Sequence, residues 1–232
     1  GFGKHEIRFK NNYRISFFHS RLKIIDPLSR SSQPMIDENG LLIFNGMIYN
    51  YLEIKKDLLS KKIHFKTNSD TEVLLKFLNY YGPKKLEKLD GMWAFAYFNF
   101  KNNSLIISRD KFGEKPLYYS LKNNELIFGS NLNYISTISN SNYKINYHKL
   151  ESIIKNSFRS LFLDNETLFK GISSLESGTY LEYDSKKNIQ IKKYWLPEKV
   201  KTKKNKSYKK IIIDLKKKFF KSIKRRFISD FP

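Results

Sequence analysis

Two loops of identical composition, each lying between two apolar runs, constrain the fold more than any other feature of the sequence. Both loops read Lys-Asn-Asn, at residues 101–103 and 122–124. Short polar loops between apolar runs are typical of β-hairpins. The predicted strands around them cover residues 93–100 and 104–109 for the first loop, and 116–121 and 125–129 for the second. A third pair is predicted at residues 179–183 and 189–194, so antiparallel sheet is expected.

Further strands and helices are predicted before these hairpins. Apolar runs at residues 14–25 and 41–44 are typical of strands. Asn50 and Glu53 have the spacing of a capping box, which predicts a helix with a buried stripe of Leu52, Ile54, Leu58 and Leu59. Ser69 and Glu72 repeat this signal before a helical pattern of Val73, Leu74, Phe77 and Leu78. These patterns together predict an α+β domain over residues 1–195.

A basic segment, residues 196–232, follows the predicted domain. Apolar residues recur there every three or four positions from Tyr208 to Phe227, which predicts an amphipathic helix with a lysine-covered outer face. The whole chain carries a formal net charge of +22. Of its 44 basic residues only 8 are Arg, the side chain best suited to phosphate recognition. An AT-rich genome would explain much of the Lys and Asn content, so nucleic acid and membrane are not expected as main partners.

Three features that the sequence lacks exclude classes of site and of protein. The sequence contains no cysteine, which excludes a disulfide scaffold, thiolate metal sites and a cysteine nucleophile within these 232 residues. No apolar run approaches the ~20 residues that span a bilayer. The four histidines are scattered without ligand spacing, so no metal site is predicted.

Three short segments carry candidate chemistry. Arg21 lies in an otherwise alternating strand and suits bidentate binding of a carboxylate. Asn45-Gly46 is by itself typical of a type I′ turn, although an Asn amide and a Gly N–H can also act together as oxyanion donors. Asp70 is by itself an acid in the first turn of a helix, and it could also bind an ammonium group. Each segment alone favours the structural interpretation.

Taken in order, these segments resemble the glutamine-hydrolysing asparagine synthetase family, and specifically its N-terminal class II glutamine amidotransferase domain. The resemblance extends from about residue 15 to the end of the chain. Its further blocks are residues 91–96, 108–119, 167–172, 177–181 and 224–232. One position departs from the family pattern: Met47 stands where the family has Glu.

The resemblance implies a four-layer helix–sheet–sheet–helix fold with two stacked antiparallel sheets, that of an N-terminal-nucleophile hydrolase. It implies that Asn45 and Gly46 form an oxyanion hole and that Arg21 and Asp70 bind the α-carboxylate and α-ammonium of glutamine. Met47 would then weaken ammonium binding. In the family the nucleophile is an N-terminal Cys, which is expected upstream of this chain. The 232 residues are therefore expected to be an inactive fragment.

The resemblance also implies a larger cytoplasmic enzyme of asparagine biosynthesis, with a homodimer as a candidate assembly. Ammonia from glutamine would pass to a synthetase domain that begins near the end of residues 196–232 and uses ATP and Mg²⁺ to amidate aspartate. No cofactor is expected in these 232 residues. Two alternatives remain open: an amidotransferase for another acceptor, such as a cell-surface sugar precursor, and a basic module that binds nucleic acid or a membrane surface. Contact of the apolar stripe from Tyr208 to Phe227 with the domain or a downstream domain would favour a linker, and free exposure of that stripe would favour a membrane surface.

Overall fold

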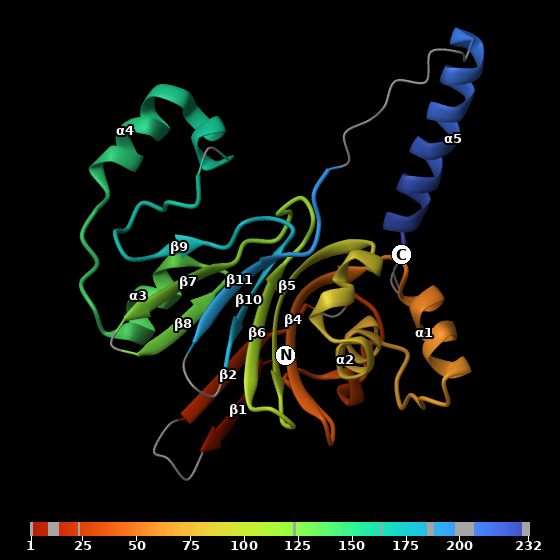
Figure 1. The fold of residues 1–232 in the computed structure, drawn as a ribbon, viewed down its shortest axis with the longest axis horizontal. Helices are drawn as coiled ribbons and strands as arrows, with labels where there is room; N and C mark the ends of the chain where they lie inside the picture. The colour runs from red at the N-terminus through yellow and green to blue at the C-terminus, as the bar shows by residue number, and fades with distance from the viewer. Residues whose placement is uncertain are drawn as a thin grey trace.

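A six-stranded antiparallel sheet forms the centre of the molecule in the computed structural model (Figure 1). The structure describes residues 2–8, 14–22, 24–122, 124–162, 164–184, 188–197 and 207–228. The strand order in the sheet is β11-β10-β6-β5-β4-β3. The strands are β3 (Met35–Ile36), β4 (Gly40–Ile48), β5 (Gly91–Asn99), β6 (Ser104–Arg109), β10 (Thr179–Tyr183) and β11 (Ile189–Lys193). Pairing of β5 with β6 and of β10 with β11 confirms two of the three predicted strand pairs.

A second layer of strands packs on one face of this sheet. It comprises β1 (Phe2–Arg8), β2 (Arg14–Ser20), β7 (Tyr118–Lys122), β8 (Glu125–Gly129) and β9 (Ser173–Ser174). Strands β1 and β2 form one antiparallel pair, and the other three form a sheet in the order β8-β7-β9. Phe17 of β2 meets Phe128 of β8 edge to face, with ring centroids 6.2 Å apart. The pairing of β7 with β8 confirms the remaining predicted hairpin.

Alternation along β5 divides the core between the two faces of the central sheet. Ala94, Ala96 and Phe98 belong to the core shared with the second layer of strands. Trp93 and Phe95 belong to the other core, which packs against helices α1 (Tyr51–Ser60) and α2 (Asp70–Tyr81). The near-continuous apolar run of β5 thus reflects burial on both faces.

Helix α3 (Leu132–Ser139) supplies the fourth layer. Tyr119 and Phe128 face the core between the sheets, whereas their neighbours Ser120 and Ile127 line a small cavity together with Ser139 at the end of α3. Successive side chains of a strand point to opposite faces, so α3 lies on the outer face of β7 and β8. The predicted order of helix, sheet, sheet and helix is present.

The remaining helices lie at the periphery. Helix α4 (Tyr147–Asn156) continues into a short 3₁₀ helix (Ser157–Phe162), and two further 3₁₀ helices cover Ser29–Ser31 and Pro83–Lys88. Lys149 of α4 is buried, and its Nζ pairs with Asp164 at 2.6 Å and donates to the Ser160 carbonyl at 2.7 Å. A buried lysine paired with a carboxylate and a backbone carbonyl therefore fixes α4 against the segment that follows it.

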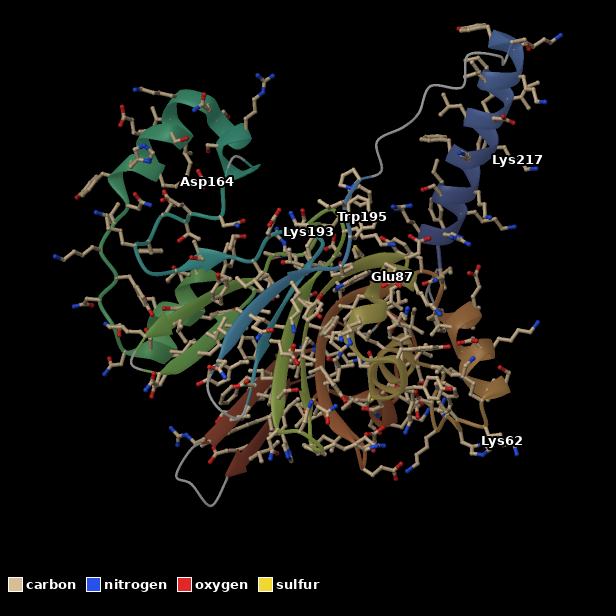
Figure 2. The ribbon with its side chains drawn as sticks, in the orientation of Figure 1. Lys62, Glu87, Asp164, Lys193, Trp195 and Lys217 are labelled. Carbon is tan, nitrogen blue, oxygen red and sulfur yellow. The ribbon has the colours of Figure 1, made fainter. Side chains whose placement is uncertain are left out.

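Helix α5 (Tyr208–Arg226) projects from the domain (Figure 1) and has no buried residue. Figure 2 shows side chains along it, Lys217 among them, pointing away from the rest of the molecule. Its described contacts with the domain lie at its C-terminal end, where Arg225 pairs with Asp90 at 2.7 Å and with Glu53 at 2.9 Å. The Arg226 guanidinium lies 4.9 Å from the ring centroid of Tyr49. The predicted helix is confirmed. Its apolar stripe is largely exposed among the described residues, with Tyr208, Phe219 and Phe227 80%, 60% and 78% exposed, so packing of the stripe on the domain, which would have favoured a linker, is not seen there.

Two local predictions about the first helix are wrong. Leu52 and Leu59 are 58% and 50% exposed, and Tyr51 occupies the core in their place. The Asn50 side chain does not cap α1. Instead it donates to the Lys88 carbonyl at 3.0 Å and accepts from the Asp90 N–H at 2.9 Å. Within the described residues no helix is long and apolar enough to cross a membrane.

Candidate active site

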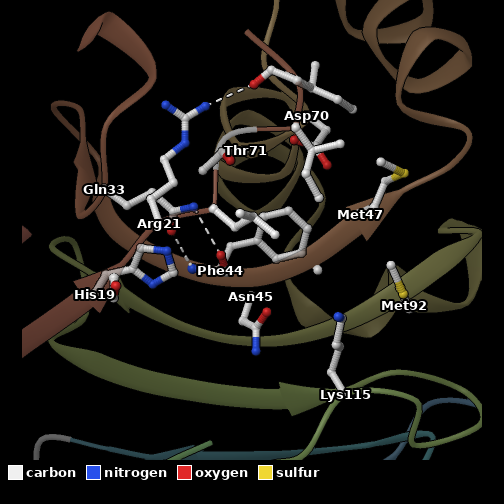
Figure 3. Close-up of a pocket in the computed structure, with 15 residues that line it drawn as sticks. His19, Arg21, Gln33, Phe44, Asn45, Met47, Asp70, Thr71, Met92 and Lys115 are labelled. Atoms are coloured by element: carbon white, nitrogen blue, oxygen red, sulfur yellow. Dashed lines mark hydrogen bonds between the residues drawn. The ribbon is translucent and has the colours of Figure 1, made fainter. Parts of the chain in front are cut away.

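Several segments distant in sequence line one pocket (Figure 3). All five residues predicted to bind substrate or stabilise an oxyanion lie in its wall: Arg21, Asn45, Gly46, Met47 and Asp70. The cavity has a volume of about 120 Å³, against the ~10–15 Å³ that one buried water requires. Residues 49 positions apart in the sequence therefore meet at a cavity that can hold a small polar molecule.

Arg21 directly follows the last residue of β2. Its Nη2 donates to the backbone carbonyls of Ile25 at 2.9 Å and Asp26 at 2.8 Å. These bonds draw the chain into a turn, which explains why the strand predicted to reach residue 25 ends at Ser20. The guanidinium therefore both organises this turn and places a permanent positive charge in the pocket wall.

Asp26 connects that turn to the start of α2. Its Oδ2 accepts from the backbone N–H of Asn68 at 2.9 Å and from Nε of Arg30 at 3.1 Å. Burial raises the pKa of Asp26, but the hydrogen bonds to its carboxylate, from Asn68 and Arg30 among others, together with the charge of Arg30 bring the net pKa below the ordinary value. An ionised Asp26 thus holds the Arg21 turn against the segment that leads to Asp70.

Asp70 is the first residue of α2, and Ser69 caps this helix because its Oγ accepts from the Thr71 N–H at 3.1 Å. The predicted capping box is incomplete, because the Glu72 carboxylate accepts from the N–H groups of Lys66 and Thr67 and the Ser69 N–H donates to Thr67 Oγ1. Asp70 is only 6% exposed. Burial raises the pKa of Asp70 to about 6, against the opposing effects of hydrogen bonds from the Ile48 and Thr71 N–H groups and of the positive charge of Arg21. Burial also lowers the pKa of Arg21. In the pocket wall the Asp70 carboxylate and the Arg21 guanidinium each favour the charged form of the other.

Asn45 and Gly46 lie inside β4, so the turn that this dipeptide predicts by itself is wrong. Strand β4 continues to Ile48 and pairs with β5 along its whole length. A Cβ at Gly46 would lie 2.1 Å from the carbonyl oxygen of Met92. Glycine is required here because the neighbouring strand approaches too closely for any side chain.

Gln33, for which the sequence predicted no role, holds β4 just before Asn45. Its Nε2 donates to the Phe44 carbonyl at 3.0 Å, and its Oε1 accepts from the Phe44 N–H at 2.6 Å (Figure 3). The backbone N–H and carbonyl of Phe44 are thereby both hydrogen-bonded on the edge of β4 that faces Gln33. This contact fixes the strand that carries the predicted oxyanion donors.

Met47 and Met92 face each other in the register of β4 and β5, and both line the pocket. Met47 is 5% exposed. A thioether is only a weak acceptor and cannot pair with an ammonium group as a carboxylate does. Among the described residues that line the pocket, Asp70 is the one carboxylate.

His19 and Lys115 also line the pocket, and neither was predicted there from the sequence. Burial, and to a lesser degree the charge of Arg21, lowers the pKa of His19 to about 4, so its imidazole is neutral at pH 7. The closeness of His19 to Arg21, two residues apart at the end of β2, could have indicated that the histidine lies at the same site. Lys115 comes from the loop after β6, and no local pattern indicates its position.

This arrangement suits a molecule with both charges at one end and a neutral polar group at the other. Arg21 and Asp70 can hold the two charges, and the Asn45 amide and Gly46 N–H can donate to a carbonyl oxygen. Figure 3 shows Asp70 on one side of β4 and Asn45 with Lys115 on the other. No cluster of three or more His, Cys, Asp or Glu side chains suited to a metal ion occurs in the described part of the chain.

Residues 4–195 match the family model described as the glutamine amidotransferase domain. A relative from Methanocaldococcus jannaschii, named as a glutamine-hydrolysing asparagine synthetase, is 34% identical over 95% of this chain and 45% of its own length. Asparagine synthetase [glutamine-hydrolyzing] 1 of Bacillus subtilis is 43% identical over 50% of this chain and 18% of its own length. The chain thus spans less than half the length of these curated relatives.

A solved structure of glutamine phosphoribosylpyrophosphate amidotransferase from B. subtilis shares the fold. It superposes with a TM-score of 0.55 at 17% identity and covers 78% of this chain and 35% of that chain. This likeness, together with the layers described above, confirms the expected α+β N-terminal-nucleophile hydrolase fold.

Proposed function

Because this chain belongs to the family of glutamine amidotransferase domains, we propose that its pocket binds L-glutamine as part of an enzyme that releases ammonia from it. The observation that carries the proposal is the meeting of Arg21 and Asp70, of opposite charge, in one small cavity. A free amino acid presents a carboxylate and an ammonium group on one carbon atom. Two opposite protein charges beside each other suit that pair of groups.

The roles of the residues follow from their positions. Arg21 binds the α-carboxylate and Asp70 binds the α-ammonium group. The Asn45 side chain and the Gly46 N–H donate to the oxygen of the side-chain amide, where negative charge develops when a nucleophile attacks. Gln33 keeps these two donors in place through its paired hydrogen bonds with Phe44.

We extend the proposal to the longer relatives. The chain is the glutaminase part of a cytoplasmic asparagine synthetase, with residues 1–195 forming the glutaminase domain and residues 196–232 leading to a synthetase domain that uses ATP and Mg²⁺ to amidate aspartate. Support comes from the names of the relatives and from the share of their length that the chain spans. The attacking thiol would be supplied from outside these residues, which contain no cysteine.

Isothermal titration calorimetry of the 232-residue chain tests the binding proposal. Glutamine is compared with 4-aminobutanamide, which lacks the α-carboxylate, and with glutaramic acid, which lacks the α-ammonium group. We expect each truncated analogue to bind at least about tenfold more weakly, since ~1.4 kcal/mol changes affinity tenfold. Asp70→Asn should lower the affinity for glutamine and leave that for glutaramic acid unchanged, whereas Asp57→Asn on α1 should alter neither. A folded chain that binds no glutamine would refute the proposal.

An ammonia-release assay tests the proposed source of the nucleophile. The 232-residue chain should bind glutamine without turnover, and a version extended upstream to an N-terminal Cys should hydrolyse it. Turnover by the unextended chain would contradict the cysteine mechanism. An upstream reading frame without a Cys would remove the enzyme assignment.

A further inference from the structure

The loop from Arg109 to Lys115, part of a segment that carried the family resemblance, has no role in the function proposed above. The carboxylate of Asp110 shapes this loop. It is fully buried and accepts from the backbone N–H groups of Phe112, Glu114 and Lys115, at 3.0, 3.0 and 2.9 Å. It also accepts from the N–H of Trp93 in β5 at 3.2 Å, which ties the loop to the strand beside β4.

Arg109 holds the same loop from its other side. Its Nε donates to the Lys115 carbonyl at 2.8 Å, and its Nη2 donates to the Gly113 carbonyl at 2.9 Å. The N–H and the carbonyl of Lys115 are therefore both bound by side chains of the preceding residues. These bonds fix the backbone of Lys115 and so the point from which its side chain extends.

The Lys115 side chain ends in the pocket. Figure 3 shows its nitrogen directed toward β4 from the side on which Asn45 lies, whereas Asp70 lies on the other side of that strand. Within the described part of the chain, no carboxylate forms an ion pair with it. Lys111 in the same loop differs, because its Nζ donates to the carbonyls of Glu87 and Leu89 at 3.0 and 2.8 Å.

We infer that Lys115 is a third charged contact of the pocket, which makes the site a receptor for an amino acid with a second carboxylate, namely glutamate. The inference rests on the proposed function, since it takes glutamine to lie with its amide beside Asn45 and Gly46. Two protein cations and one anion, Arg21, Lys115 and Asp70, then match the two carboxylates and one ammonium group of glutamate.

Hydrolysis of glutamine replaces the amide NH₂ with a water oxygen and leaves a carboxylate at this position. The ammonium of Lys115 attracts that new charge, whereas the neutral amide gains little from it. A partly buried pair is screened less than one in water, so part of the attraction remains at physiological ionic strength, although it weakens as the salt concentration rises. The pocket therefore holds the product more tightly than the substrate, and glutamate inhibits the site at which it forms.

Calorimetric titration of the 232-residue chain with glutamate and with glutamine tests this inference. We expect the wild-type chain to bind glutamate about tenfold more tightly than glutamine. Lys115→Met should lower the affinity for glutamate about tenfold and change that for glutamine less than twofold. Lys115→Arg should retain the preference, and Lys101→Met, which removes the same charge from an exposed turn, should leave both affinities unchanged.

The outcomes separate this inference from the proposed function. If glutamine binds and Lys115→Met leaves the ratio of the two affinities unchanged, the inference is wrong and the glutamine site stands. If neither amino acid binds the folded chain, both are wrong. Should Lys115→Met fail to fold, raising the salt concentration from 20 to 500 mM gives an independent test on the wild-type chain. A preference that comes from an ion pair must decrease with salt, and one that persists unchanged would contradict the inference.

Discussion

The carboxylate of Asp26 accepts a hydrogen bond of 2.9 Å from the backbone N–H of Asn68, a residue 42 positions later in the chain. This bond joins the turn that Arg21 organises to the segment that begins α2 with Asp70. The two charges of the proposed ligand site thus keep their separation through a third residue, which does not line the pocket.

Asp26→Asn should destabilise the fold at neutral pH. The pKa of Asp26 is depressed, so its contribution is fully present above the ordinary pKa near 4 and is lost as pH falls through the lower folded value. We expect a loss of about 1–3 kcal/mol in the free energy of unfolding at pH 7. The loss should shrink in acidic solution as the carboxyl becomes protonated, as measured by urea denaturation at pH 7 and at acidic pH. Glu38→Gln, on an exposed loop, serves as the control, and an equal loss at both pH values would contradict the role of the charge.

Asp70→Asn should stabilise the fold at pH 7 while it abolishes selective glutamine binding. Burial raises the pKa of Asp70 from 3.8 to about 6, so the folded chain binds more protons than the unfolded chain between these pH values. The free energy of unfolding therefore falls as pH rises through this interval, and the cost of about 3 kcal/mol is fully present above pH 6. Thermal denaturation at pH 7.5 measures the gain. A lower melting temperature would show that the hydrogen bond from Ile48 outweighs the cost of the buried charge.

The affinity of the wild-type chain for glutamine should fall as pH decreases below about 6. An ionised Asp70 is needed to pair with the α-ammonium group, and protonation of the carboxyl removes that attraction. Each pH unit well below the pKa should cost about tenfold in affinity. Calorimetric titrations between pH 4.5 and 7.5 measure the profile, and an affinity independent of pH would rule out Asp70 as the ammonium partner.

Gly46→Ala should disrupt the antiparallel pairing of β4 with β5. The new Cβ would lie 2.1 Å from the Met92 carbonyl oxygen, so one of the two strands must shift. We expect a loss of at least about 2 kcal/mol in the free energy of unfolding together with weaker glutamine binding. Gly129→Ala is the matched control, because the nearest atoms there lie 3.9 Å from an added Cβ. Equal effects of the two substitutions would contradict the close approach of β5 at Gly46.

Met47→Glu should strengthen glutamine binding by placing a second carboxylate beside Asp70. The gain should be about three- to tenfold in affinity, with a loss of stability because the position is 5% exposed and buries the added charge. Calorimetry and thermal denaturation measure the two effects. Met47→Gln keeps the shape without the charge and should give no gain. An unchanged affinity in Met47→Glu would mean that the ligand does not approach this residue.

The hairpins were predictable from the sequence because their signals are local. The two Lys-Asn-Asn loops fix where the strands reverse, and β5, β6 and β8 begin or end within about two residues of the predicted positions. The start of α1 was also predicted, but its capping residue was assigned wrongly. Asn50 binds Lys88 and Asp90 instead, and those partners lie about 40 positions away in the chain.

The pocket residues also divide into those that a local sequence pattern identifies and those that only contacts between distant segments place. Arg21 and Asp70 could be identified because they belong to recognisable segments, although their meeting depends on Asp26 and Asn68, which show no pairing signal in the sequence. Gln33 and Lys115 could not be assigned to the pocket at all. Their positions depend on hydrogen bonds to β4 and to Asp110, and such contacts appear only when the strands are in place.

The attachment of α5 by its last residues makes the helix a lever arm. Nineteen residues at 1.5 Å each give a length of about 28 Å, and the ion pairs of Arg225 lie at one end of it. A rotation of about 10° at that end moves the other end by about 5 Å on this geometry. Anything attached at Tyr208 would thus experience a large displacement from a small adjustment beside Tyr49, two residues beyond the pocket residue Met47.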